Sequence, residues 1–344
     1  MICDSHYHSY GDLNLLDSIA YYEDNMAREK VCKAAVLSLH HDGDRDDILA
    51  DLKTLWIKYK MQPNIYASMS LWHYFDHRDT ADGYLNQLEQ GLEQGFDGIK
   101  MLEGKPDFRK RLGRRLDDPI FDKLYQKIEA LSIPVTMHAN DPAAFWKTRD
   151  YEKYGWYYGG EGFRTKEEIY AEVDGILKKF PKIRLILAHF YFLSEELDRA
   201  AHFLDSHPNV SLDLTPGGEM FVDFSKNISK ASAFFETYQN RLLFGSDLTN
   251  SNKLNYHTKR YALINQALGG GADFEILNLK VKPLHLSDGA LQKIKYQNFI
   301  DCYGETPKPL NKAAIQNELL AIDRKMLDEQ QAEDYAILCS DFGV

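Results

Sequence analysis

The chain has 344 residues, of which 44% are hydrophobic and 27% are charged. This composition is ordinary for a folded globular protein and excludes a disordered or collagen-like chain. Basic residues number 41 against 52 acidic residues, which gives a formal net charge of −11. Because a negatively charged protein repels phosphate backbones and anionic lipid, we expect neither nucleic acid nor a membrane as a partner.

The N-terminus and the cysteines bear on the cellular compartment. The chain begins Met-Ile-Cys-Asp-Ser-His, without the basic and apolar regions of a signal peptide. Its cysteines, Cys3, Cys32, Cys302 and Cys339, show no CxxC spacing and are typical of reduced thiols. No apolar run approaches the length of a membrane span. We therefore expect a cytoplasmic protein.

Short apolar segments alternate with amphipathic helical patterns along most of the chain. The predicted strands cover residues 2–6, 33–39, 65–71, 98–102, 134–138, 183–189, 210–214 and 241–247. Helical patterns lie between them, for example at 46–59, 84–94, 166–180 and 194–206. Eight strand–helix units at intervals of roughly 30 residues predict an α/β protein with a single (β/α)8 (TIM) barrel. The alternative, an open doubly wound sheet, lacks its GxGxxG signature after the first strand.

Two regions fall outside the eightfold pattern. An insertion after the fifth strand, at residues 145–163, is rich in aromatic residues and glycine. Because it follows a strand, we expect it at the mouth of the barrel, with an aromatic loop packed on the surface as the alternative. Residues 277–309 predict a terminal helix with its exit, and residues 312–336 a further helix. The chain is therefore divided into a barrel at 1–309 and a C-terminal helical extension at 310–344, which either caps the barrel or forms a homodimer contact.

Five side chains able to bind a metal lie at or just beyond the ends of predicted strands. They are His6, His8, His138, His189 and Asp247. Because the carboxyl ends of parallel strands converge on one mouth of a barrel, these side chains should meet there. A lone histidine is weak evidence for a metal site, since most histidines serve other purposes. Several imidazoles and a carboxylate at one mouth, with a position left for water, predict a catalytic zinc-type site.

The segments that hold these residues resemble motifs of the amidohydrolase superfamily. Asp4-Ser-His-Tyr-His8 looks like the DxHxH motif of the first strand in that superfamily. The segments that end at His138, His189 and Asp247 resemble its fifth-, sixth- and eighth-strand signatures. The nearest branch is the amidohydrolase-related group that includes aminocarboxymuconate-semialdehyde decarboxylase. This resemblance implies a metal-dependent TIM-barrel enzyme, but it does not specify one reaction.

The resemblance also implies a role for each side chain. His6, His8, His138 and Asp247 would bind the metal, and His189 would activate the water or substrate or complete the metal shell. Asp247 and His189 would be the catalytic residues, with Asp247 accepting a proton from the water. One divalent metal is implied, with zinc as the first expectation and manganese or another ion as alternatives. The other arrangement is a pair of metals bridged by a carboxylated Lys100 on the fourth strand.

Three functions are compatible with these residues. The first is a metal-dependent hydrolase that cleaves a C–N or C–O bond of a small molecule with a metal-activated water. The second is a non-oxidative decarboxylase, or another lyase, acting on a small unsaturated or aromatic carboxylic acid at the same site. The third, a barrel that only binds a ligand, is disfavoured because every expected ligand position is filled. Candidate substrate-binding residues are Lys100, Trp72, His73, Arg164 and Tyr191.

Overall fold

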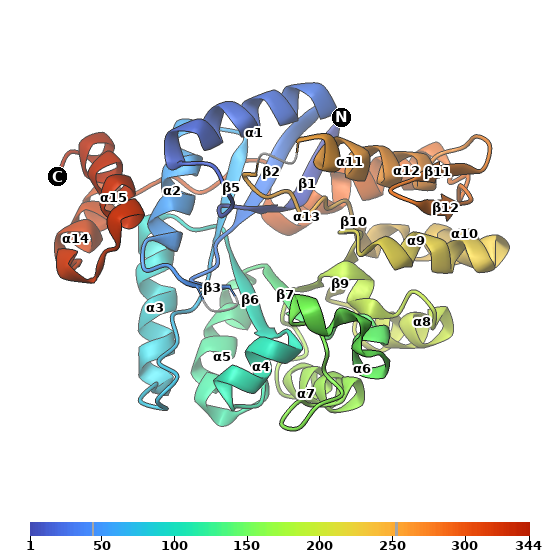
Figure 1. Cartoon of the computed structure of the whole chain (residues 1–344), viewed down its shortest axis with the longest axis horizontal. Helices are drawn as coiled ribbons and strands as arrows, with labels where there is room; N and C mark the ends of the chain where they lie inside the picture. The colour runs from blue at the N-terminus through green and yellow to red at the C-terminus, as the bar shows by residue number, and fades with distance from the viewer. Residues whose placement is uncertain (43–44, 252–253) are drawn as a thin grey trace.

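The computed structural model describes residues 1–42, 45–251 and 254–344. Eight parallel strands form one sheet that curls into a barrel, with helices around it (Figure 1). In sheet order the strands are β1 (Ile2–His8), β2 (Val31–Leu37), β5 (Ile65–Met69), β6 (Gly98–Gly104), β7 (Val135–Ala139), β8 (Leu185–Leu187), β9 (Val210–Asp213) and β10 (Leu242–Leu243). Each predicted strand overlaps one of these, and the predicted TIM barrel is confirmed.

The barrel closes between its first and last strands, through the chain that follows β10. The backbone N–H of Ser5 donates to the carbonyl of Phe244 at 2.9 Å, and that of His8 donates to the carbonyl of Leu248 at 2.7 Å. Tyr7 and Leu248 also form a parallel β-bridge. This pairing brings the start of the chain beside residues 244–248 and so determines which side chains share the mouth.

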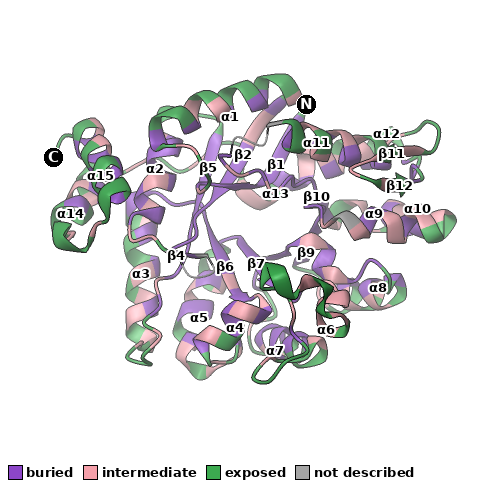
Figure 2. Cartoon of the chain, in the orientation of Figure 1, coloured by how far each residue is buried: buried purple, intermediate pink, exposed green. Residues whose placement is uncertain are grey.

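Helices cover the outside of the barrel. The α-helices are α1 (Leu15–Glu29), α2 (Ala50–Lys60), α3 (Ala81–Gln94), α4 (Pro106–Leu112), α5 (Asp122–Leu131), α6 (Ala144–Lys147), α7 (Lys166–Lys179), α8 (Leu197–Ser206), α9 (Gly218–Lys226), α10 (Ile228–Thr237), α11 (Leu254–Leu268), α12 (Asp288–Gln292), α13 (Asn298–Tyr303), α14 (Lys312–Ala321) and α15 (Glu329–Phe342). The strands are buried, whereas the helices expose their outer faces (Figure 2). Over the described residues, none of the helices is both long and apolar enough to cross a bilayer.

Helix α7 illustrates why the outer helices form where they do. Thr165 and Glu168 make a reciprocal capping box at its N-terminus, which satisfies two backbone N–H groups that would otherwise lack partners. Ile169, Val173 and Ile176 recur at helical spacing and are fully buried against the sheet. Burial of each such side chain contributes about 1.5–3 kcal/mol relative to exposure. The cap therefore sets where the helix begins, and the apolar stripe sets which face it buries.

Residues 277–309 differ from the predicted single helix. They begin within a hairpin of β11 (Phe274–Ile276) and β12 (Leu279–Val281), and only later form a helical stretch from α12 through a π-helical turn at Lys293–Gln297 to α13. The hairpin turn places Leu277 and Asn278 at φ values of 52° and 60°. Because no glycine marks this left-handed turn, the sequence did not reveal it.

The predicted helix at 312–336 is in fact two helices, α14 and α15. Asp328 and Gln331 form a capping box that starts the second helix. Helix α14 packs on α3 and α15 packs on α2, at the edge of the molecule (Figure 1). Trp56 Nε1 donates to Asp341 at 2.7 Å across the second of these contacts. The C-terminal extension therefore packs on the barrel of its own chain, while a homodimer contact stays a prediction.

Candidate metal centre

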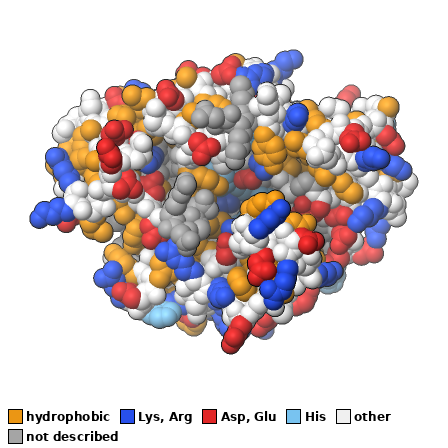
Figure 3. Space-filling model, viewed as in Figure 1, with side chains coloured by type: hydrophobic (Ala, Val, Ile, Leu, Met, Phe, Trp, Pro, Cys, Tyr) orange, Lys and Arg blue, Asp and Glu red, His pale blue; other side chains and the backbone are white. Residues whose placement is uncertain are grey.

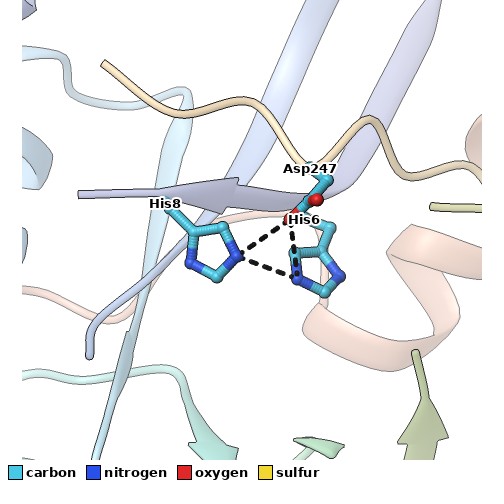
Figure 4. Close-up of side chains that lie close together, drawn as sticks. All are labelled: His6, His8 and Asp247. Atoms are coloured by element: carbon cyan, nitrogen blue, oxygen red, sulfur yellow. Dashed lines mark hydrogen bonds and ion pairs between the residues drawn. The ribbon is translucent and has the colours of Figure 1, made fainter. Parts of the chain in front are cut away.

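Two histidines of β1 and an aspartate beyond β10 bring three donor atoms together at the mouth of the barrel. His6 and His8 are two residues apart in an extended strand, so their side chains lie on the same face. Their Nε2 atoms are 3.2 Å apart. Asp247 Oδ1 lies 3.1 Å from His8 Nε2 and 3.8 Å from His6 Nε2 (Figure 4). These three atoms form the only group of potential metal ligands found among the described residues.

The spacing of these donor atoms fits a divalent metal ion. Atoms bonded at about 2.0–2.1 Å to a tetrahedral ion lie about 3.3 Å from one another, and the three observed separations bracket that value. Imidazole nitrogens and a carboxylate oxygen are ligands that zinc and related metals accept. His6, His8 and Asp247 can therefore hold such an ion with little movement.

Asp213, at the end of β9, orients the ring of His6. Its Oδ2 lies 2.8 Å from His6 Nδ1, so Nδ1 carries the proton and Nε2 offers a lone pair to the mouth. Burial and the nearby charge of Lys100 lower the pKa of His6 to about 3, which keeps the ring neutral. Asp213 was not predicted from the sequence. The available signal was a carboxylate inside the apolar segment 210–214, where an acid is costly without a partner.

Arg260 of α11 holds Asp247 from the other side. Its Nη1 lies 3.2 Å from Asp247 Oδ2 and donates to the backbone carbonyls of Asp247 and Ser246 at 2.7 and 3.1 Å. Burial alone would raise the pKa of Asp247, but Arg260 and His8 hold it well below its usual range. Arg260 was not predicted either, because an arginine within an outer helix has no local sequence signal of this role.

Lys100 of β6 extends into the same site. Its Nζ is 3.1 Å from His6 Nε2, and the side chain is buried. Burial lowers the pKa of Lys100 to about 8, although Asp213 and Asp247 oppose this effect. An amino group at this position is compatible both with an unmodified lysine beside one metal and with a carboxylated lysine that bridges two.

His138 and His189 line the same cavity but are not part of the donor group. Their ring centres are 4.7 Å apart. His138 Nε2 lies 3.3 Å from Asp141 Oδ1, and its role as a metal ligand stays a prediction. His189 Nδ1 lies 3.2 Å from the carbonyl of Thr215, so this nitrogen carries the proton and Nε2 is a free acceptor. Burial lowers the pKa of His138 to about 3 and that of His189 to about 4, so both rings are neutral at pH 7.

The backbone around the mouth adopts conformations that non-glycine residues rarely take. Asp247 has a φ of 56°, and residues 189–192 are all left-handed, with φ between 51° and 56°. Gly245 allows a further close approach, because a Cβ at this position would lie 3.2 Å from the Cβ of His6 and 2.6 Å from Thr215 Oγ1. Strained backbone of this kind collects at functional sites, where the surrounding packing holds it.

The donor group opens into a cavity of about 490 Å³. The cavity is visible as a hollow near the centre of the face in Figure 3. Phe145 and Trp156 of the aromatic insertion form part of its wall. Tyr158 ties the insertion to the site, since its hydroxyl donates to Asp141 Oδ2 at 2.9 Å. The insertion therefore lies at the mouth of the barrel, as the sequence predicted.

Of the five predicted substrate-binding residues, only Lys100 lines this cavity. Trp72 lines a separate cavity of about 300 Å³ between the barrel and the C-terminal helices. His73 is buried with its ring nitrogens 2.8 Å from Tyr84 Oη and from Glu103 Oε1. Contact of either Trp72 or His73 with a substrate bound at the metal centre would therefore require a rearrangement.

Arg164 and Tyr191 also lie away from the metal centre. Arg164 is exposed, and its guanidinium is 3.3 Å from Glu168 one helical turn further along. Tyr191 is buried, with its ring against those of Tyr170 and Phe203. The left-handed turn that begins at His189 directs this tyrosine into the helical layer. The sequence could not predict that reversal, because it depends on the local backbone.

The fold is that of a TIM barrel, and a group of side chains that could hold a metal ion lies at the carboxyl ends of its strands. The profile of the amidohydrolase family (Amidohydro_2) matches residues 72–304, and the chain belongs to this family, whose members are generally metal-dependent. A search of curated proteins gives no match.

Solved structures confirm the fold at low sequence identity. An uncharacterised TIM-barrel protein from Bordetella bronchiseptica is 15% identical, with 88% of this chain and 97% of that chain covered and a TM-score of 0.55. A 4-oxalomesaconate hydratase from Rhodopseudomonas palustris is 14% identical, with coverages of 88% and 95% and a TM-score of 0.54. A 2,6-dihydroxybenzoate decarboxylase is 13% identical, with coverages of 88% and 99% and a TM-score of 0.55.

Proposed function

We propose that the protein is a metal-dependent hydrolase that cleaves a C–N or C–O bond of a small molecule. The observation that supports this most directly is the convergence of His6 Nε2, His8 Nε2 and Asp247 Oδ1 within 3.1–3.8 Å of one another. These residues would hold one divalent ion, with zinc as the first candidate, and His138 is a further candidate ligand. Such an ion lowers the pKa of a bound water toward about 7 and polarises a carbonyl group.

The contacts around the site favour His189 over Asp247 as the group that accepts a proton. Asp247 shares Oδ2 with Arg260, and its low pKa makes it a weak base at neutral pH. His189 is neutral, with Nδ1 fixed by a carbonyl and Nε2 free as an acceptor. In this proposal Asp247 acts mainly as a metal ligand. His189 takes a proton from the attacking water and returns it to the leaving group.

A second candidate function is a decarboxylase that uses the same residues. The observation in its favour is the buried amino group of Lys100 beside His6, together with the guanidinium of Arg260 in the same cavity wall. Two fixed cations next to the metal position would hold a substrate carboxylate. A non-catalytic barrel is the remaining alternative.

Metal content and product analysis test this proposal. Elemental analysis should find about one equivalent of divalent metal in the purified protein. The double variant His6→Ala/His8→Ala should lose it, whereas His202→Ala, at an exposed histidine of α8, should retain it. A protein that binds no zinc or manganese would exclude both enzymatic functions. Release of an amine or alcohol from amides, lactones and esters supports the hydrolase, and release of carbon dioxide from carboxylic acids supports the decarboxylase instead.

A further inference from the structure

A second cavity adjoins the one that contains the metal centre. It measures about 610 Å³ and lies between α4 and the aromatic insertion. Leu102, Lys105 and Trp156 belong to the walls of both cavities, so the two cavities adjoin across these side chains. We call the cavity with the donor group the inner cavity and this one the outer cavity.

We propose that the outer cavity binds the distal part of an elongated substrate, and that this part is an aromatic or other planar group carrying an anion. The proposal rests on the proposed function in one respect, namely that the reacting bond lies in the inner cavity. At about 490 Å³ the inner cavity already has the size of an ordinary small-molecule site. The outer cavity therefore provides room for a second portion of the substrate.

Aromatic rings continue from the inner cavity into the outer one. Phe145, in the wall of the inner cavity, stacks on Trp156 with ring centres 5.6 Å apart and an interplanar angle of 16°. The ring centre of Tyr154, in the wall of the outer cavity, lies 5.5 Å from that of Trp156. Trp156 is 42% exposed and Tyr154 is 57% exposed. Large aromatic surfaces left open beside a cavity are suited to stacking with a planar group.

The charges in the outer cavity favour an anion. Among the residues that the structure describes, its wall contains Lys105, Lys110 and Arg111 but only one acid, Asp107, in a chain whose net charge is −11. Lys105 lies 2.7 Å from Asp107. Arg111 lies 3.1 Å from Asp46.

Lys110 supplies the charge that the described acids do not balance. Its ammonium donates to the carbonyl of Glu161 at 3.0 Å and lies 4.1 Å from the centre of the Phe163 ring. No ion pair joins it to a carboxylate within residues 1–42, 45–251 and 254–344. A phosphate, sulfonate or carboxylate on the edge of an aromatic ring would satisfy this ammonium while the ring stacks on Trp156.

The inner cavity has a different balance. Lys100, Lys105 and Arg260 line it together with Asp141, Glu219 and Asp247. Among the described lining residues, lysines and arginines equal the acids in number there before any metal is bound, whereas they outnumber the acids in the outer cavity. The positive charge of the outer cavity, which needs no bound metal, favours an anionic group on the part of the substrate that lies there.

Binding of two matched probes to the full-length protein tests the proposal. Phenyl phosphate carries the ring and the anion, and benzyl alcohol carries the ring alone. Each dissociation constant would be measured by ligand-observed NMR, in zinc-loaded protein and in protein stripped of metal with a chelator. We expect phenyl phosphate to bind more tightly than benzyl alcohol in both forms. Because the outer cavity needs no metal, this result remains informative even if the hydrolase proposal fails.

Two variants and a control identify the site. Lys110→Gln should weaken phenyl phosphate binding by about two- to fivefold and leave benzyl alcohol unchanged, since the ammonium is at the surface. Trp156→Ala should weaken both probes. Lys178→Gln, at an exposed lysine of α7, should change neither. Equal binding of the two probes, equal effects of the two lysine substitutions, or binding of phenyl phosphate only when zinc is present would overturn the proposal.

Discussion

The guanidinium of Arg260 binds both the side chain and the backbone of Asp247, the residue that completes the donor group. The three contacts of its Nη1 atom, at 2.7–3.2 Å, span Asp247 Oδ2 and the carbonyls of Asp247 and Ser246. Asp247 has a φ of 56°, and this left-handed backbone conformation costs free energy for a residue other than glycine. Arg260 therefore stabilises this conformation and directs the other carboxylate oxygen, Oδ1, toward the two histidines.

Replacement of this arginine should weaken metal binding without unfolding the protein. We expect Arg260→Gln to raise the dissociation constant for zinc by about 10- to 100-fold, the usual effect of losing a residue that orients a ligand. Arg149→Gln, at an arginine that is 71% exposed, is the control. Competition with a chromophoric chelator measures the affinity. Unchanged zinc affinity in a folded Arg260→Gln protein would contradict this role.

Asp213 should also affect the zinc affinity, because it orients His6 at the opposite side of the donor group from Asp247. Asp213→Asn removes the negative charge from the carboxylate–histidine pair and allows the amide to present a donor to His6 Nδ1, which disfavours the tautomer with a free Nε2. We expect a loss of about 10- to 100-fold in zinc affinity. Asp205→Asn, on α8, is the matched control. The idea fails if both variants bind zinc as the parent does.

A variant of His189 distinguishes its two possible roles, proton acceptor and metal ligand. If it accepts the proton, His189→Gln should lower kcat by about 10²- to 10⁴-fold while the protein still binds a full equivalent of metal. Both quantities are measured on the same preparation, kcat with a substrate from the product screen and metal by elemental analysis. Loss of the metal from this variant would show that His189 is a ligand instead.

The buried carboxyl group of Asp4 should make stability depend on pH. Burial raises the pKa of Asp4 from 3.8 to about 7, although Tyr261 and two backbone N–H groups donate to it. The folded state thus binds the proton more tightly than the unfolded state. The contribution of the protonated Asp4 to stability is complete below pH 3.8 and is lost as the pH rises through about 7.

The matched variant for this effect is Asp4→Asn, which keeps an acceptor for the two N–H groups but does not ionise. Between pH 5 and pH 8 the free energy of unfolding of the parent should fall by about 3 kcal/mol more than that of the variant. Urea unfolding at several pH values in chelator-treated protein measures the difference. Parallel pH profiles for the two proteins would show that Asp4 is not protonated in the fold.

The sequence predicted the barrel because that prediction depends on local patterns repeated many times. Eight apolar segments with helical patterns between them are sufficient, even where strand ends are inexact, as at β10. It did not predict the hairpin at β11 and β12 or the break between α14 and α15. Those features depend on a single turn or a single cap, where one local choice decides the structure and no repetition supports it.

For the metal centre, the sequence determined the chemical types: imidazoles and a carboxylate at strand ends, at positions that a parallel barrel brings to one mouth. Tertiary structure decided which donor atoms converge, because closure of β1 onto residues 244–248 brings Asp247 to His6 and His8. It also supplied Asp213 and Arg260, which act from distant elements and have no local signature. It removed His73 and Tyr191 from the mouth, because backbone direction after a strand depends on packing that a linear pattern does not encode.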